Sequence, residues 1–303
     1  MKARSQSSNP PFPLSPKAML LRDEPLAPLT SFGIGGPAEL LLLPAAVEDF
    51  LEAVNFADSR KMPWRILGSG TNVLVPDEGL RGLIIKPWLR FSEITIEGTQ
   101  LKAQAGATMW SASRAAAEEA LSGLEWACGI PGTVGGAVFM NAGVKEGEVK
   151  DVLSSAVVLR RDGGIEQHSR EDLALGYRSS SLQENGGVVL EVTFELERGD
   201  ESRILIEMNN HLQKRRQTQP LNMPNCGSVF RNPPGDYSGR LIEAAGCKGL
   251  KHGGMQVSEL HANFIVNNGG GSARDVLALV EEIRRRVYDY SGVTLEMEMR
   301  ILE

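Results

Sequence analysis

Two glycine-rich segments carry the clearest chemical signal in the sequence. The first, Gly68-Ser69-Gly70-Thr71-Asn72, follows an apolar stretch at 64–67 that is typical of a strand. Small residues let consecutive backbone N–H groups converge on an anion, so this loop suits a pyrophosphate. An ordinary strand-to-strand turn uses the same residue types, and the loop alone leaves both interpretations open.

The second segment, Gly129 to Gly143, is longer and more specific. It begins Gly-Ile-Pro-Gly-Thr-Val-Gly-Gly-Ala and ends Asn-Ala-Gly. Side chains are absent or small here, which fits a backbone that lies against a planar ligand or its phosphates. A core segment would not give up so much packing volume. Together the two segments indicate a bound cofactor.

Other common sites are excluded by inspection. No glycine directly precedes a lysine, so a Walker A loop is absent, and Val73 stands where a dinucleotide fingerprint needs its third glycine. The four histidines form no helical metal pair. The three cysteines show no CxxC spacing and make no disulfide framework. We expect buried thiols and no metal.

Length and composition point to a globular protein. The 303 residues suggest about two domains. The 33 glycines are about 11% of the chain, against a usual 7%. A net charge of −6 argues against a nucleic-acid binder. No apolar run has the length of a signal peptide or membrane span, so we expect a cytoplasmic protein with no membrane contact.

Apolar periodicity predicts an α+β protein in which short strands outnumber helices. A mobile N-terminal tail is expected at 1–26, a loop-rich stretch at 219–268, and a domain boundary near 198–202, where Arg198-Gly199-Asp200 interrupts the pattern. A capping signal at Ser272 and Asp275 predicts the start of a long helix. Strands are expected at 40–43, 64–67, 73–75, 83–85, 91–96, 156–159, 165–168, 190–196 and 293–301, and helices at 47–54, 109–121, 204–216 and from 272 through 287.

In six segments the chain resembles the UDP-N-acetylenolpyruvoylglucosamine reductase family. They occur in the family's order at 30–36, 68–74, 129–143, 176–180, 227–233 and 295–298. The resemblance implies an FAD-binding domain of the vanillyl-alcohol-oxidase (PCMH) type at 27–200, with subdomains at about 27–86 and 87–200. A smaller α+β substrate-binding domain would follow at 201–303. Only 50 residue steps separate Arg178 from Ser228, which fits the family's shorter type, without an extra closing loop.

The same resemblance implies non-covalent FAD, with NADPH as co-substrate. It implies a flavoenzyme of peptidoglycan precursor synthesis that reduces UDP-N-acetylenolpyruvoylglucosamine to UDP-N-acetylmuramate and needs no obligate protein partner. The residues assigned to FAD are Gly68, Ser69, Gly70, Thr71, Asn72, Val73, Leu74, Pro131, Gly132, Thr133, Gly135, Gly136, Ala137, Asn141, Ala142 and Gly143.

Three residues are expected to carry the chemistry by their place in the family's segments. Flavin N5 would deliver a hydride to C3 of the enolpyruvyl group, and Ser228 would protonate C2. Arg178 would bind the carboxylate on which negative charge grows. Glu298 would lie beside the enolpyruvyl group. Glu296 would share its strand face, so the choice between these two carboxylates depends on the family register.

Further substrate contacts are expected from Tyr177, Asn232 and Arg216. Lys214 and Arg215 are alternatives to Arg216, because all three end a helix, where cations also suit the helix dipole. Two other functions stay open: another FAD oxidase of the same fold, and a catalytically silent nucleotide-sugar binder. The silent binder would be expected to have lost one of the three reactive residues.

Overall fold

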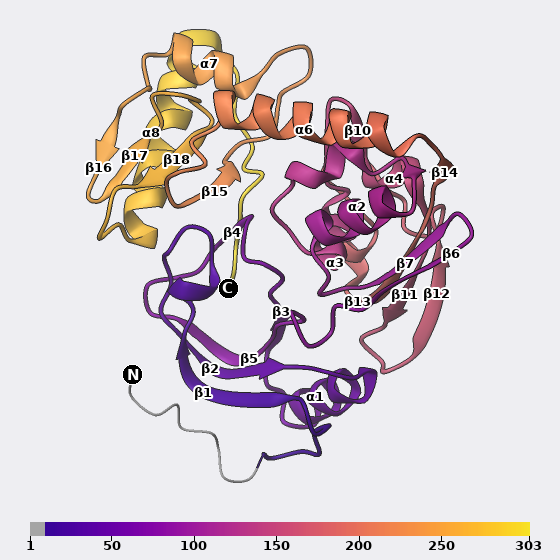
Figure 1. Ribbon diagram of the computed structural model, residues 1–303. Coiled ribbons are helices and arrows are strands. Elements are labelled where there is room, and N and C mark those ends of the chain that lie inside the picture. The colour runs from indigo at the N-terminus through magenta and orange to yellow at the C-terminus, as the bar shows by residue number, and fades with distance from the viewer. Residues whose placement is uncertain (1–9) are drawn as a thin grey trace. The chain divides into compact units, whose positions relative to one another are not determined.

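The computed structural model describes residues 10–303 and combines helices with many short strands (Figure 1). Contacts divide the chain into two compact units. Unit 1 contains residues up to 22, 40–69 and 81–213, and unit 2 contains residues 23–39, 70–80 and 214–303. The chain therefore enters unit 2 three times. The predicted α+β class is confirmed, and the domain boundary near residue 200 stays a prediction.

A five-stranded antiparallel sheet forms one half of unit 1, in the order β12-β11-β13-β7-β6. Its alternating apolar residues face a core in which Val192 and Phe194 have no exposed surface. Helices α2 and α3 contact this sheet through β7 and β13 (Figure 1). The elements are β6 (Ile94–Glu97), β7 (Gln100–Gln104), α2 (Met109–Glu118), α3 (Val134–Met140), β11 (Leu153–Leu159), β12 (Ile165–Ser169) and β13 (Val188–Glu195).

A four-stranded sheet has the order β1-β2-β5-β3 and carries helix α1. The apolar face of α1 places Phe50 in a core with Leu83 and Ile85, all without exposed surface. β3 and β5 run parallel. The elements are β1 (Met19–Pro25), β2 (Pro37–Leu43), α1 (Val47–Ser59), β3 (Trp64–Ile66) and β5 (Leu80–Ile85).

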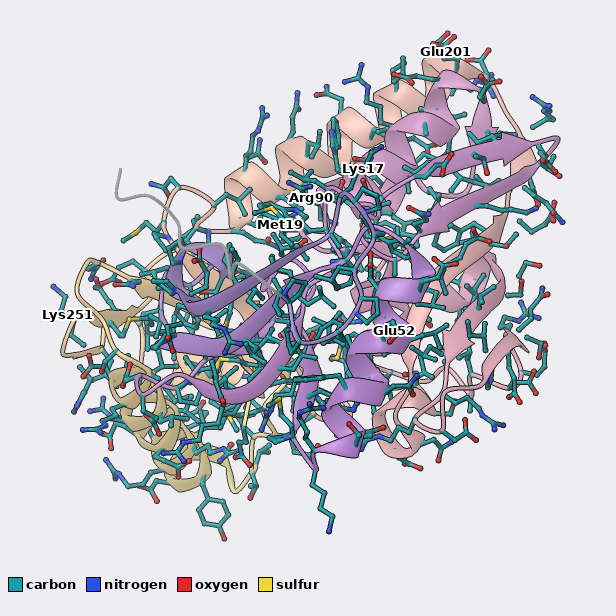
Figure 2. All side chains as sticks on the ribbon, turned by 90° about the horizontal axis from the view of Figure 1, so that it is seen from below. Lys17, Met19, Glu52, Arg90, Glu201 and Lys251 are labelled. Carbon is teal, nitrogen blue, oxygen red and sulfur yellow. The ribbon has the colours of Figure 1, made fainter. Side chains whose placement is uncertain are left out.

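The predicted tail is shorter than expected, because Met19–Pro25 form β1. Residues just before and in this strand are held by Arg90, whose guanidinium donates to the Lys17 carbonyl and lies 3.1 Å from the Met19 sulfur (Figure 2). Residues 1–9 of the predicted tail lie outside the described residues.

Unit 2 contains a second antiparallel sheet, in the order β15-β18-β17-β16, next to helices α7 and α8. The stretch at 219–268, predicted as loop-rich, holds all four strands and α7. Ser272 and Asp275 form the predicted capping box at the start of α8. The elements are β15 (Asn225–Ser228), α7 (Ser238–Ala244), β16 (Lys251–His252), β17 (Met255–Val257), β18 (Phe264–Asn267) and α8 (Ala273–Ser291).

The predicted strand at 293–301 is wrong over most of its length. Only β19 (Arg300–Ile301) is a strand, and it pairs in parallel with β4 (Val73–Leu74). Before it, Met297 makes one isolated bridge to Phe230. Burial nevertheless alternates as predicted, since Leu295 and Met299 are buried and Glu296 is exposed. Hydrogen bonds with residues 229–231 thus hold residues 296–298 in an extended conformation, although no regular ladder forms.

The remaining elements are short, apart from α6. They are η1 (Ala27–Leu29), β8 (Leu121–Ser122), η2 (Glu125–Gly129), β9 (Gly143–Val144), β10 (Gly147–Glu148), α4 (Val149–Val152), α5 (Leu182–Asn185), β14 (Glu197–Arg198) and α6 (Glu201–Thr218).

Candidate functional site

The predicted site residues are divided between the two units. Unit 1 contains Gly68, Ser69, the segment 129–143, Tyr177 and Arg178. Unit 2 contains the remaining ones, namely 70–74, Arg216, Ser228, Asn232 and Glu298.

The two glycine-rich segments meet in unit 1. A Cβ atom on Gly68 would lie 2.6 Å from the Thr133 hydroxyl, closer than real Cβ contacts allow. Thr133 is the N-cap of α3, and its Oγ1 accepts from the Gly136 backbone N–H at 3.2 Å. Gly135 packs in the same way, with its absent Cβ 2.8 Å from the Ala105 Cβ. Glycine is required at 68 and 135 because neighbouring chain occupies the space.

The end of the second segment anchors the loop that carries Arg178. The Asn141 amide donates to Glu148 at 2.9 Å and to the Gly176 carbonyl at 2.8 Å. Arg178 donates from Nη2 to the Gly143 carbonyl at 2.9 Å, and its backbone has a left-handed φ of 55°. Such a φ is uncommon outside glycine. The predicted flavin segment and the predicted carboxylate-binding arginine are therefore in direct contact.

Lys86 also contacts the first glycine loop, and the sequence prediction missed it. Its ammonium donates to the Gly68 carbonyl and lies 5.2 Å from the centre of the Trp88 ring. The side chain is 2% exposed, and burial lowers the pKa of Lys86 to about 8. The available signal was a lysine directly after the apolar run 83–85.

In unit 2, Ser228 and Glu298 lie on adjacent segments. The Glu298 N–H donates to the Val229 carbonyl at 2.8 Å, and the Arg231 N–H donates to the Glu296 carbonyl at 2.9 Å. Both Ser228 and Glu298 are partly buried, whereas Glu296 is exposed. This difference favours Glu298 as the sheltered carboxyl group.

Residues 70–74 are hydrogen-bonded, directly or through Ser31, to the segments that carry Glu298 and Ser228. The Asn72 amide donates to the Glu298 carbonyl at 3.2 Å. The Ser31 hydroxyl lies 3.2 Å from the Gly70 carbonyl and 2.6 Å from that of Asn225, the first residue of β15. Gly227, just before Ser228, has a φ of 78°. Within unit 2, hydrogen bonds through Ser31 therefore connect this part of the predicted cofactor loop to β15, the strand that ends at Ser228.

Two ionisable groups of unit 2 have shifted pKa values. Burial raises the pKa of the Cys226 thiol, and the Glu298 charge raises it further. Cys226 is thus a neutral thiol and not a nucleophile. Burial lowers the pKa of Arg300, and the neighbouring Arg231 guanidinium lowers it again.

The other predicted substrate residues show mixed surroundings. Tyr177 is 49% exposed, with its ring 5.1 Å from the Arg178 guanidinium carbon. Asn232 accepts from the Ser238 N–H at 3.0 Å, at the start of α7. Arg216 is exposed in the last turn of α6.

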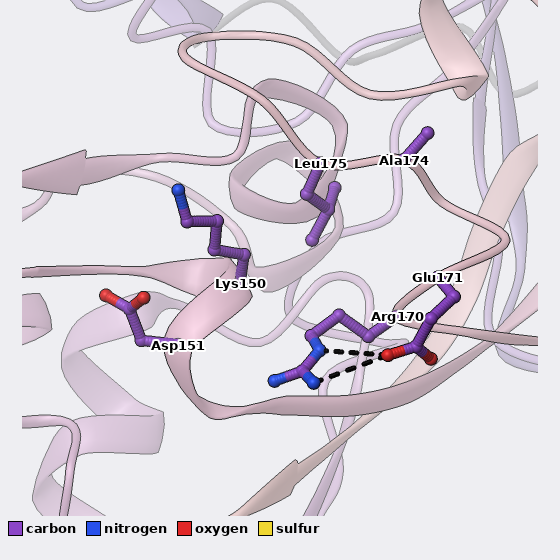
Figure 3. Close-up of a pocket in the computed structure, with 6 residues that line it drawn as sticks. All are labelled: Lys150, Asp151, Arg170, Glu171, Ala174 and Leu175. Atoms are coloured by element: carbon purple, nitrogen blue, oxygen red, sulfur yellow. Dashed lines mark hydrogen bonds and ion pairs between the residues drawn. The ribbon is translucent and has the colours of Figure 1, made fainter.

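A hollow of about 490 Å³ in unit 1 contains none of the predicted site residues. It is lined by Lys150, Asp151, Arg170, Glu171, Ala174 and Leu175, and Arg170 pairs with Glu171 at 3.3 Å (Figure 3). Two cations balance two carboxylates, so the lining has no excess charge that would attract an anion.

The first glycine loop fits a phosphate-bearing cofactor. Within residues 10–303, the backbone N–H groups of Ser69, Gly70, Thr71 and Asn72 donate to no other residue. Buried or half-buried N–H groups are normally paired. Four consecutive N–H groups without a protein acceptor are therefore suited to bind an external anion.

Within residues 10–303, no helix combines the length and apolar character of a membrane span. No three His, Cys, Asp or Glu side chains in that range are grouped closely enough to hold a metal ion.

Comparison with known proteins gives two family matches. Residues 38–169 match an FAD binding domain, and residues 219–302 match the C-terminal domain of UDP-N-acetylenolpyruvoylglucosamine reductase. These ranges lie on either side of the predicted boundary near 200.

Relatives aligned over nearly the whole chain point to the same family. Reductases with this name from Alkaliphilus oremlandii and Streptococcus pneumoniae are each 43% identical. The first alignment covers 95% of this chain and 94% of the relative, and the second covers 92% of each. The crystal structure of a Thermus caldophilus UDP-N-acetylenolpyruvylglucosamine reductase superposes with a TM-score of 0.81 at 36% identity, covering 95% of this chain and 99% of that one.

Proposed function

The chain belongs to the UDP-N-acetylenolpyruvoylglucosamine reductase family, and from this we propose that it reduces the enolpyruvyl ether of that UDP sugar to UDP-N-acetylmuramate. The observation that carries the proposal is 43% identity over nearly the full length of a named reductase. The protein is an FAD-dependent oxidoreductase of peptidoglycan precursor synthesis, with NADPH as the reductant.

Bound FAD supplies the hydride for C3 of the enolpyruvyl group. The protein must then stabilise the negative charge that develops at C2 and its carboxylate. We assign this to Arg178, because a guanidinium can hold a carboxylate by two hydrogen bonds. Its anchoring to the Gly143 carbonyl supports this role, since a preorganised cation costs no reorganisation during the reaction.

Ser228 is the proposed proton donor to C2. A hydroxyl is a weak acid, and it becomes effective when the acceptor is a strongly basic enolate carbon. Glu298 is the proposed carboxyl group beside the enolpyruvyl unit, supported by its partial burial and its attachment to the segment that follows Ser228. Tyr177, Asn232 and Arg216 remain proposed substrate contacts.

The function is tested by mixing purified yellow protein with NADPH and following the loss of NADPH absorbance. We expect oxidation that depends on the UDP-enolpyruvyl sugar and yields UDP-N-acetylmuramate. A protein that oxidises NADPH equally fast without the sugar, or that lacks flavin absorbance, would contradict the proposal.

The role of Ser228 is tested with Ser228→Ala. We expect kcat to fall at least 100-fold, since positioned acid catalysis typically contributes about 100- to 10,000-fold, whereas NADPH should still bleach the flavin. Ser291→Ala, at the exposed end of α8, is the matched control and should keep the wild-type rate. Normal turnover by Ser228→Ala would remove this assignment.

A further inference from the structure

Lys86 is a buried charge for which the proposed reaction has no use. Its side chain is 2% exposed, and no other lysine or arginine among residues 10–303 is buried. Taking an ammonium group out of water is costly unless it is paired. A buried lysine beside a loop of the proposed cofactor site therefore needs an explanation.

The rest of the described chain does not neutralise this charge. None of the ion pairs found in residues 10–303 includes Lys86. Buried Asp49 shows the contrast. Its carboxylate accepts from Ser15, Ala45 and Ala46 through N–H groups, and from the Ser15 hydroxyl. Lys86 has one hydrogen-bond acceptor, the Gly68 carbonyl, together with the face of the Trp88 ring.

The contact with the Gly68 carbonyl fixes the direction of the next N–H group. A trans peptide is planar, so its C=O and N–H point in opposite directions. When Lys86 holds the Gly68 oxygen, the Ser69 N–H must point to the other side of the loop. That N–H donates to no residue within 10–303. It is thus aimed where a ligand could accept it.

We propose that Lys86 is a positioning residue for FAD: its ammonium orients the Gly68–Ser69 peptide toward the diphosphate and supplies positive charge beneath the loop. This inference rests on the proposed function, because it assumes that the loop binds FAD. The diphosphate supplies the negative charge that no described side chain provides. Lys86 takes no part in hydride or proton transfer.

The test measures FAD release from diluted holoenzyme, through the fluorescence that free flavin regains. Lys86→Met removes both the charge and the donor, and Lys86→Gln removes the charge but keeps a polar group. We expect the FAD dissociation constant to rise at least tenfold for Lys86→Met and at least threefold for Lys86→Gln. The matched control Lys102→Met alters a half-exposed lysine on β7 and should stay within twofold.

A purely structural role predicts a different pattern. Loss of packing would lower the unfolding midpoint in FAD-free buffer, whereas the positioning role predicts an unchanged or higher midpoint there and a smaller gain on adding FAD. Two neutral replacements are used so that one unfolded variant does not prevent the test. Wild-type affinity in either folded variant would overturn the inference. A wild-type protein that binds no FAD would instead overturn the proposed function.

Discussion

The burial of Lys86 predicts how the protein's stability changes with pH. Its pKa falls from 10.5 in the unfolded chain to about 8 in the folded protein. Below pH 8 both states carry the proton, and the folded state bears the full cost of the buried charge. Between about pH 8 and 10.5 only the unfolded chain retains the proton, so the unfolding free energy rises with pH. At 1.36 kcal/mol per pKa unit, the total rise is about 3 kcal/mol.

Lys86→Met isolates this effect. Urea unfolding of both proteins without added FAD, at several pH values from 7 to 10.5, gives the difference in unfolding free energy between wild type and variant. We expect the wild type to gain about 3 kcal/mol relative to the variant across this range. Cys226 acts in the opposite direction, because its raised pKa makes stability fall above pH 9, and this contribution cancels since both proteins contain it.

A difference that stays constant with pH would refute the reasoning. It would mean that the Lys86 ammonium is solvated in the folded protein and has an ordinary pKa. A difference that falls with pH would have the wrong sign and would require a carboxylate partner for Lys86.

Three other changes have expected outcomes. Glu298→Gln should lower kcat at least tenfold while Glu296→Gln stays near wild type, and steady-state kinetics showing the reverse would move the role to Glu296. Gly68→Ala places a Cβ 2.6 Å from the Thr133 hydroxyl and should weaken FAD binding at least tenfold with an unchanged circular dichroism spectrum; wild-type affinity would show that the loop can give way. Ser272→Ala removes the N-cap of α8 and should cost about 1 kcal/mol in urea unfolding, and a cost near zero would contradict the capping role.

Long periodic elements could be predicted from the sequence. The capping box at Ser272 and Asp275 and the apolar face of α8 are local signals, and both are found in the structure. The four strands within 219–268 were missed, because strands of two to four residues are too short for alternation to be visible. The tail prediction failed at Met19–Pro25 for a different reason: the order of this segment comes from pairing within a sheet, which depends on residues distant in the sequence.

The glycine segments show what composition could and could not predict. The clusters were interpreted as loops around a cofactor, and Gly68 does lie where the two segments meet, against Thr133. Other glycines are required by the chain itself. A Cβ on Gly36 would lie 2.3 Å from the Gly79 nitrogen, and one on Gly79 would lie 2.1 Å from the Pro37 oxygen. Lys86 was missed because the observation that singles it out is its contact with Gly68, eighteen residues earlier.

The threefold entry of the chain into unit 2 has a consequence for its synthesis. Phe32, Ile34 and Leu74 belong to a core whose other members all lie beyond residue 225. On a ribosome that adds about 5–20 residues per second, those early side chains wait roughly 10–40 s for their partners. During that time they are exposed apolar surface. For the same reason, a fragment containing only residues 214–303 would lack part of its own core, so the smaller unit matures only when the whole chain has been made.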